Sequence, residues 1–159
     1  LLIGADLRNP KLDEVFPELH KQRGLSDYLT YSKYQLNQLL VKSTEYDNLT
    51  FLPSGSIPPN PSEILQSKKM SELFQKLKKS FDYIIVDTAP SVLVADTFLI
   101  NHLADSTLYV MRSGFTTKKL FEFVEESRKS KKLNNVGFVL NDVKENKLGY
   151  AGQYGYAND

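Results

Sequence analysis

The sequence contains no cysteine, has almost no net charge and lacks any long apolar run. Without cysteine the chain can form neither disulfides nor thiolate metal sites, which fits a reducing compartment such as the cytoplasm. A formal net charge of +1 produces no overall field that would attract nucleic acid or an anionic membrane. No apolar stretch reaches the roughly 18 residues that a membrane-spanning helix needs. We therefore expect a globular protein that recognises any anionic partner locally and binds no nucleic acid.

Short apolar segments alternate along the chain with helical patterns. The segments are rich in Val, Ile, Tyr and Phe and mostly lack strict alternation with polar residues, as is typical of strands that are covered on both faces. They predict strands at 1–5, 49–54, 82–87, 106–112 and 136–141. The order of strands and helices predicts an α/β fold, with a doubly wound, mostly parallel sheet and helices on both faces.

Three helices have recognisable start signals. Asn60 is followed by a proline at the first helical position and by Glu63 at the third. Asp96 is a candidate cap for a second helix, and the Thr116–Thr117 pair precedes a third. The predicted helices cover 61–80, 97–104 and 118–132.

The two ends of the chain differ from its middle. Leu1, Leu2 and Ile3 resemble the inside of a buried strand with no turn or cap before them, so we infer that the chain begins within a domain. Residues 148–159 place tyrosines among glycines, a composition that builds neither a helix stripe nor a strand face. Because no repeat or long linker divides the rest, we expect a core over 1–147 and a flexible tail over 148–159.

Two aspartates stand where predicted strands end. Asp6 follows the strand at 1–5 and Asp87 ends the strand at 82–87. In parallel α/β sheets, ligands bind at the carboxyl ends of the strands, so the two carboxylates converge if the strands are neighbours. Such a pair suits Mg²⁺ together with nucleotide phosphates. The alternative is that each aspartate only caps a turn, which a lone aspartate at a strand end more often does.

Four segments together resemble those of the bacterial tyrosine kinases, P-loop proteins related to the MinD and ParA ATPases. "LLIGADLRNPKL" (1–12) looks like their second Walker-type motif, and "FDYIIVDTAP" (81–90) like their Walker B motif. "LPSGSIPPNPSEIL" (52–65) is similar to their proline-rich stretch, and the tyrosine-rich end completes the likeness. The resemblance implies a P-loop NTPase-like fold, with ATP and Mg²⁺ as cofactors.

The resemblance also implies roles for three charged residues. Asp87 would bind Mg²⁺ directly or through water, and Asp6 would share the metal or help to activate the tyrosine hydroxyl. Arg8 would contact a phosphate or a neighbouring subunit. The alternative for Arg8 is a surface salt bridge with no catalytic role.

Further positions follow from the same resemblance. Thr88 would contact the nucleotide, and Asn141 would face its base, although an asparagine after a strand is more often a turn residue. Tyr150, Tyr154 and Tyr156 would accept phosphate, unless they form only a sticky tail.

The family resemblance implies several partners. The domain would form a ring of identical subunits that phosphorylate each other's tyrosines, and a cognate tyrosine phosphatase would reverse this. It would work at the inner face of the membrane with a membrane-spanning chain-length regulator, fused upstream or separate. Together they would control capsular or exopolysaccharide synthesis and export.

The sequence departs from the family in two ways. Gly4 stands where many members have aspartate, which leaves Asp6 as the remaining carboxylate of that motif. The phosphate-binding pattern G-x-x-x-x-G-K-[ST] is absent, so we expect it upstream and expect this chain alone to bind ATP weakly or not at all. Two alternatives remain. One is a non-catalytic assembly module, which Gly4 favours. The other is a MinD- or ParA-like ATPase switch, which a C-terminal amphipathic helix would favour, but the glycine-spaced tail cannot form such a helix.

Overall fold

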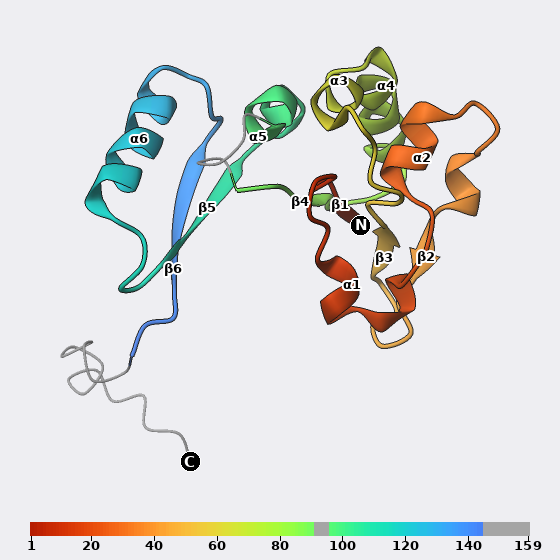
Figure 1. Ribbon diagram of the computed structural model, residues 1–159, viewed down its shortest axis with the longest axis horizontal. Helices are drawn as coiled ribbons and strands as arrows, with labels where there is room; N and C mark the ends of the chain where they lie inside the picture. The colour runs from red at the N-terminus through yellow and green to blue at the C-terminus, as the bar shows by residue number, and fades with distance from the viewer. Residues whose placement is uncertain (91–95, 145–159) are drawn as a thin grey trace. The chain divides into compact units, whose positions relative to one another are not determined.

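The computed structural model describes residues 1–90 and 96–144, which fall into two compact units (Figure 1). The first unit comprises Leu1–Leu103 and the second comprises Ala104–Asp159. The predicted tail, with Tyr150, Tyr154 and Tyr156, lies outside the described residues.

The first unit is built on a four-stranded sheet with the order β2-β3-β1-β4. Strand β1 pairs in parallel with both β3 and β4, as predicted, while β2 is a short antiparallel edge strand that the sequence did not reveal. The strands are β1 (Leu2–Gly4), β2 (Val41–Lys42), β3 (Thr50–Leu52) and β4 (Ile85–Asp87). The helices are α1 (Leu12–Val15), α2 (Leu25–Thr30), α3 (Pro61–Leu65), α4 (Lys68–Leu77) and α5 (Asp96–Ile100), with short 3₁₀ turns at Pro17–Leu19, Leu36–Gln38 and Asn101–Leu103.

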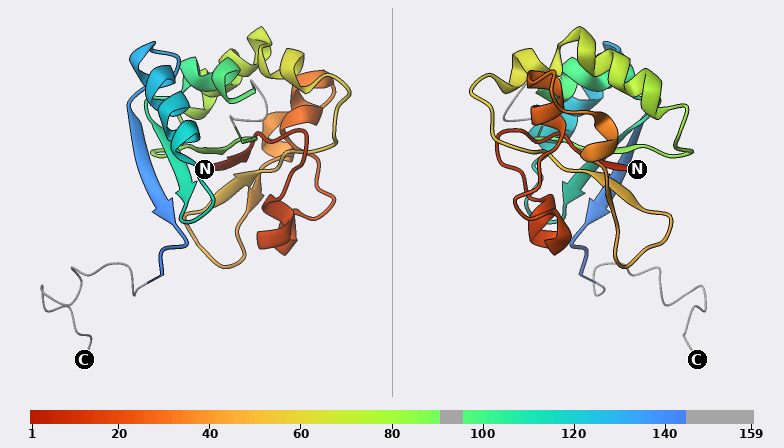
Figure 2. Two further views of the ribbon diagram at one scale, coloured as in Figure 1. Left: turned by 60° about the vertical axis from the view of Figure 1, so that its left-hand side comes forward. Right: turned by 90° about the vertical axis from the view of Figure 1, so that its right-hand side faces the viewer.

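The register of β1 and β3 places their side chains on two covered faces. Leu2 pairs with Phe51 and Ile3 pairs with Leu52, so each pair shares a face. Ile3 and Leu52 belong to the main core, to which α4 adds Met70, Leu73, Phe74 and Leu77. On the other face the Phe51 ring lies 4.7 Å from the ring of Phe16. Figure 2 shows α4 and α1 on opposite sides of the sheet.

The helix predicted from Asn60 to residue 80 is in fact two helices, α3 and α4. Asn60 is the residue before α3, as predicted, but its amide donates to the Glu63 carboxylate instead of capping the backbone. The prediction of one continuous helix is wrong because Ser67 starts a new one. The Ser67 backbone is extended, and its hydroxyl accepts a hydrogen bond from Met70 N at 3.3 Å, as an N-cap does.

The second unit contains a parallel pair of strands and one long helix. Strands β5 (Thr107–Arg112) and β6 (Val136–Asn141) match their predicted ranges closely. Helix α6 (Lys118–Lys129) begins after Thr117, whose hydroxyl accepts from Leu120 N, so the predicted cap is confirmed. The helix packs on one face of the pair, where the Phe121 ring lies 5.1 Å from the ring of Phe138.

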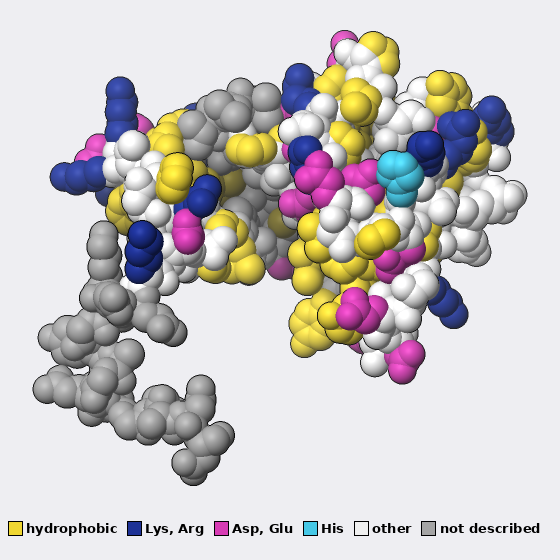
Figure 3. Space-filling view, turned by 60° about the horizontal axis from the view of Figure 1, so that its bottom comes forward, with side chains coloured by type: hydrophobic (Ala, Val, Ile, Leu, Met, Phe, Trp, Pro, Cys, Tyr) yellow, Lys and Arg dark blue, Asp and Glu magenta, His cyan; other side chains and the backbone are white. Residues whose placement is uncertain are grey.

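The prediction that every strand is covered on both faces is wrong for β4, β5 and β6 within the described residues. Ile85 of β4 is 65% exposed, and Leu108 and Val110 of β5 are 73% and 61% exposed. In the second unit the described residues include a single helix, which covers the face with Phe138 and leaves the face with Leu108 and Val110 open. In the first unit, β4 is an edge strand of its sheet. Figure 3 shows hydrophobic side chains at the surface among acidic and basic ones.

Candidate phosphate and metal site

Strands β1 and β4 end side by side and bring Asp6 and Asp87 to the same edge of the sheet. Gly4 pairs in register with Asp87, and the Ala5 N–H donates to the Asp87 carbonyl at 2.7 Å. Asp6 is the next residue after Ala5. The condition on which the predicted convergence rested, that the two strands are neighbours, is therefore met.

The protein environment disfavours the charged form of the Asp87 carboxylate. Its pKa is raised, first because surrounding protein displaces water and second because Asp6 adds negative charge. Among the described residues, none donates a hydrogen bond to the Asp87 side chain. A divalent cation would neutralise this excess negative charge, so the donor set fits the Mg²⁺ that the family implies.

One oxygen of the Asp6 carboxylate already accepts hydrogen bonds from the backbone. Its Oδ1 accepts hydrogen bonds from the backbone N–H groups of Arg8 and Asn9, at 3.0 and 2.9 Å. The turn-capping alternative therefore holds for this oxygen. The other oxygen, Oδ2, has no hydrogen-bond partner among the described residues and remains available for a metal or a proton.

Metal binding here would need ligands beyond these side chains. Within residues 1–90 and 96–144, no group of three or more His, Cys, Asp or Glu side chains is placed to hold an ion. Mg²⁺ commonly uses one or two carboxylates and completes its shell with water and phosphate oxygens. Two aspartates at a sheet edge are the kind of partial site that such an ion uses.

Arg8 is fixed by residues that the sequence did not connect with it. Its Nε donates to Asp96 Oδ2 at 2.6 Å, and its Nη2 donates to Asp96 Oδ1 at 3.2 Å and to Ser62 Oγ at 2.8 Å. The hydrogen bond from Arg8 is the main reason that the pKa of Asp96 is lowered. Asp96, predicted to precede its helix, is the first residue of α5, and its carboxylate turns to Arg8.

The turn after Asp87 is held by the same helix. Thr97 Oγ1 donates to the Ala89 carbonyl oxygen at 2.8 Å and lies within hydrogen-bond distance of Thr88 Oγ1, at 3.1 Å. The hydroxyl of Thr88, predicted to contact the nucleotide, therefore has a protein partner in this structure. Helix α5 thus contacts both Arg8 and the residues that follow Asp87.

The absence of a side chain at Gly4 has a steric reason in this structure. A Cβ atom at this position would lie 2.4 Å from Ser54 Oγ, 3.0 Å from Ser54 N and 3.1 Å from Leu12 Cδ1. Ser54 is buried and belongs to the loop after β3. An aspartate at position 4 would therefore require this loop to move.

A buried aspartate, Asp27, holds the same loop in place. Its carboxylate accepts hydrogen bonds from the N–H groups of Gly24 and Ser56, from the Ser56 hydroxyl and from Arg23. Burial opposes ionisation, but these donors outweigh it and hold the pKa of Asp27 below its usual value. Gly55, with φ of 80°, lets the loop turn beside this carboxylate. The sequence signal for this clamp is the capping pattern of Gly24 and Asp27 at the start of α2.

In the second unit, Asn141 ends β6 and behaves as a turn residue. Its side-chain oxygen accepts from the N–H of Asp142, whose φ is 59°. The structure does not test its predicted role toward a base.

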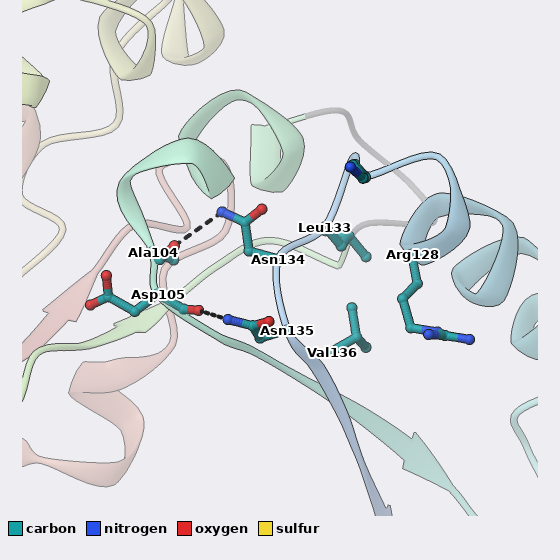
Figure 4. Close-up of a pocket in the computed structure, with 8 residues that line it drawn as sticks. Ala104, Asp105, Arg128, Leu133, Asn134, Asn135 and Val136 are labelled. Atoms are coloured by element: carbon teal, nitrogen blue, oxygen red, sulfur yellow. Dashed lines mark hydrogen bonds between the residues drawn. The ribbon is translucent and has the colours of Figure 1, made fainter.

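The second unit also has an open cavity of about 740 Å³ at the amino ends of β5 and β6 (Figure 4). Two asparagine amides on its wall are already used, since Asn134 donates to Ala104 O and Asn135 to Asp105 O. Arg128 is paired with Glu125. Because ligands of such sheets bind at the carboxyl ends of strands, this cavity is not the candidate nucleotide site.

Comparison with known proteins shows the family of the chain. No protein-family model matches the chain. The chain is 33% identical to a tyrosine-protein kinase CpsD of Streptococcus pneumoniae, over 98% of its own length and 68% of that protein's. The chain belongs to the bacterial tyrosine kinases. To another member of these kinases, the tyrosine-protein kinase YwqD of Bacillus subtilis, it is 37% identical over 98% of its length and 64% of that protein's.

Solved bacterial tyrosine kinase domains share its fold. The kinase domain of Escherichia coli tyrosine kinase ETK matches with a TM-score of 0.81 at 30% identity, covering 91% of this chain and 55% of that one. The cell division ATPase MinD of Pyrococcus furiosus matches with a TM-score of 0.66 at 24% identity and shows the fold alone. The predicted P-loop NTPase-like α/β class is thereby confirmed. The chain spans 66% of the length of a second pneumococcal tyrosine kinase, so about a third of that relative lies outside the match.

Proposed function

We propose that the complete protein containing this chain is an ATP- and Mg²⁺-dependent kinase that phosphorylates tyrosines. The observation that carries this proposal is the meeting of Asp6 and Asp87 at the ends of two paired parallel strands. Burial and the charge of Asp6 raise the pKa of Asp87, and carboxylates perturbed in this way cluster at functional sites.

In this proposal Asp87 would bind Mg²⁺ and Asp6 would contact a water of that ion, so that the pair would hold the metal while Asp6 Oδ2 stays able to accept a proton. The ion would neutralise phosphate charge. The tyrosine oxygen forms a bond to the γ-phosphorus while the bond from that phosphorus to the ADP oxygen breaks. The tyrosine proton passes to Asp6 Oδ2, the oxygen left open by the turn. Such a base raises the reaction rate about 10²- to 10⁴-fold, but phosphoryl transfer depends mostly on positioning and charge stabilisation. Glycine in place of aspartate at position 4 therefore weakens the mechanism without removing it.

The phosphate-binding segment is proposed to lie outside these 159 residues. Support comes from β4, which pairs on one edge with β1 and has no partner on its other edge among the described residues. The exposure of Ile85 also suits a further element beside this strand. A strand added here would bring its phosphate-binding loop next to Asp87. Residues 1–147 would then form the rest of the kinase core.

The acceptors in this proposal are Tyr150, Tyr154 and Tyr156, in a flexible tail over 148–159, phosphorylated between subunits of a ring. The base-facing role of Asn141 and the nucleotide contact of Thr88 belong to the same proposal. Its partners are a cognate phosphatase and a membrane-spanning chain-length regulator, and its output is control of capsular or exopolysaccharide export.

Membrane attachment is a separate proposal. Within residues 1–90 and 96–144, no helix is long and apolar enough to span a bilayer. We propose that the chain works at the inner face of the cell membrane through an upstream membrane-spanning region.

A second candidate is a non-catalytic, kinase-like assembly module of the export machinery. Gly4 favours it, because the contact with Ser54 excludes a second acidic side chain at this position as the loop stands.

Incubating the complete protein with Mg²⁺ and ATP, followed by detection of phosphotyrosine, separates these candidates. The kinase proposal expects label on the tail tyrosines and a rate that falls at least about 10²-fold in Asp6→Asn. A labelled wild type with an unchanged Asp6→Asn rate would remove Asp6 from the mechanism. No label in a folded wild type would favour the assembly module.

A further inference from the structure

Two of the three guanidinium nitrogens of Arg8 donate hydrogen bonds to described residues, and the third does not. Arg8 Nε and Nη2 donate to Asp96 and Ser62, whereas its Nη1 has no partner among the described residues. The Arg8 side chain is 42% exposed, but that of Asp96 is only 4% exposed. The guanidinium therefore rests against a buried carboxylate and presents its remaining donors to solvent.

The contacts around Asp96 form a closed set. Ser62 Oγ accepts from Arg8 and donates to Asp96 Oδ1 at 2.8 Å, so each member contacts the other two. Arg8 follows β1, Ser62 lies in α3, and Asp96 begins α5. The set therefore joins two helices of the first unit to the segment after β1, which also carries Asp6.

The contacts of Asp96 favour its charged form and fix one geometry. The hydrogen bonds from Arg8 and Ser62 outweigh desolvation of the carboxylate, since the pKa of Asp96 is lowered. Two parallel hydrogen bonds from a guanidinium to a carboxylate fix both distance and plane. Asp96 thus determines where the open end of Arg8 points.

We propose that Asp96 is a positioning residue of the kinase site. Together with Ser62 it holds Arg8 so that Nη1 is presented to an oxygen of the transferred phosphoryl group, and through Thr97 the same helix fixes the turn after Asp87. This inference rests on the proposed function, because Arg8 needs a phosphate to act on. Asp96 itself touches neither substrate nor metal.

The kinetic test uses the complete protein with Asp96→Asn, which keeps the shape and removes the charge. We expect kcat for tyrosine phosphorylation to fall about 10- to 100-fold, with KM for ATP changed less than about threefold. The double variant Arg8→Lys/Asp96→Asn should be no slower than Arg8→Lys alone, because both changes remove one interaction. Glu125→Gln, which removes the carboxylate partner of Arg128, is the matched control and should leave kcat unchanged.

A second readout is independent of activity. In ¹⁵N NMR of the complete protein, the Arg8 Nε–H should exchange slowly with water and should become fast-exchanging in Asp96→Asn. A fast-exchanging Arg8 signal in the wild type would overturn the positioning claim. Rate effects of Arg8→Lys and Asp96→Asn that multiply would overturn it as well. If the wild type shows the protected signal but forms no phosphotyrosine, the proposed function fails while the geometry stands.

Discussion

The Ala5 N–H donates to the Asp87 carbonyl at 2.7 Å, which places the chain leading into Asp6 directly beside the end of β4. With the parallel register of β1 and β4, this backbone contact brings together two segments that are more than eighty residues apart and that each carry an acidic side chain. Because the pKa of Asp87 is raised by lost hydration and by Asp6, the site is unfavourable for the ligand-free fold. Sites adapted to bind a cation often show this conflict between stability and function.

Asp87→Asn should therefore stabilise the ligand-free chain at pH 7. A raised folded-state pKa means that the wild type is penalised above that pKa, and that the penalty disappears as pH falls toward the ordinary value of about 3.9. Urea unfolding without divalent cations should show a more stable variant at pH 7 and converging curves near pH 3. A variant that is less stable at pH 7 would contradict the electrostatic explanation.

Asp27→Asn should destabilise the chain by about 3 kcal/mol at pH 7, since a buried carboxylate with several donors is replaced. The pKa of Asp27 is lowered, so its contribution is present above about pH 4 and is lost as pH falls through the folded-state pKa. Thermal unfolding between pH 7 and pH 2 should show the difference from wild type shrinking only at the acid end. Asp47→Asn, at an exposed position, is the control and should change little.

Gly4→Ala should destabilise the chain by about 1–3 kcal/mol, because the added Cβ meets Ser54 and Leu12. In a Ser54→Gly background the Oγ contact is gone, so the same change should be less destabilising. The measurement is the free energy of unfolding of all four chains. Equal losses in both backgrounds would show that Ser54 is not the obstacle.

Calorimetric titration of the 159-residue chain with Mg·ATP should give no micromolar binding. The sequence lacks the loop and lysine that hold the β- and γ-phosphates, and the two aspartates alone repel the nucleotide. The complete protein is the positive control. Micromolar affinity in the chain alone would mean that phosphates are bound by residues not considered above.

The strands and the two aspartates could be predicted because the information is local. Apolar runs ending in Asp6 and Asp87 indicate strand ends, and the ordered motifs fix the family. The two-residue strand β2 has no pattern long enough to recognise. The break between α3 and α4 depends on Ser67. Because the neighbours of Ser67 are good helix formers, the helical sequence pattern continues through this residue although the helical backbone is interrupted there.

The contacts of Arg8 could not be predicted because they are long-range. Asp96 lies 88 residues away and reads in the sequence as an ordinary helix cap. Asp27 likewise reads as a capping residue, and only the folded loop shows that its carboxylate also holds Ser56. Tertiary packing of distant segments determines polar contacts of this kind. A single sequence contains no local pattern that predicts such packing.

Binding of Mn²⁺, used in place of Mg²⁺ and followed by electron paramagnetic resonance in the complete protein with a non-hydrolysable ATP analogue, tests the shared metal site most directly. Each of Asp6→Asn and Asp87→Asn should weaken Mn²⁺ binding at least about tenfold, because each removes one carboxylate from the same ion. Wild-type affinity in both variants would contradict the central claim that these two residues form the metal site.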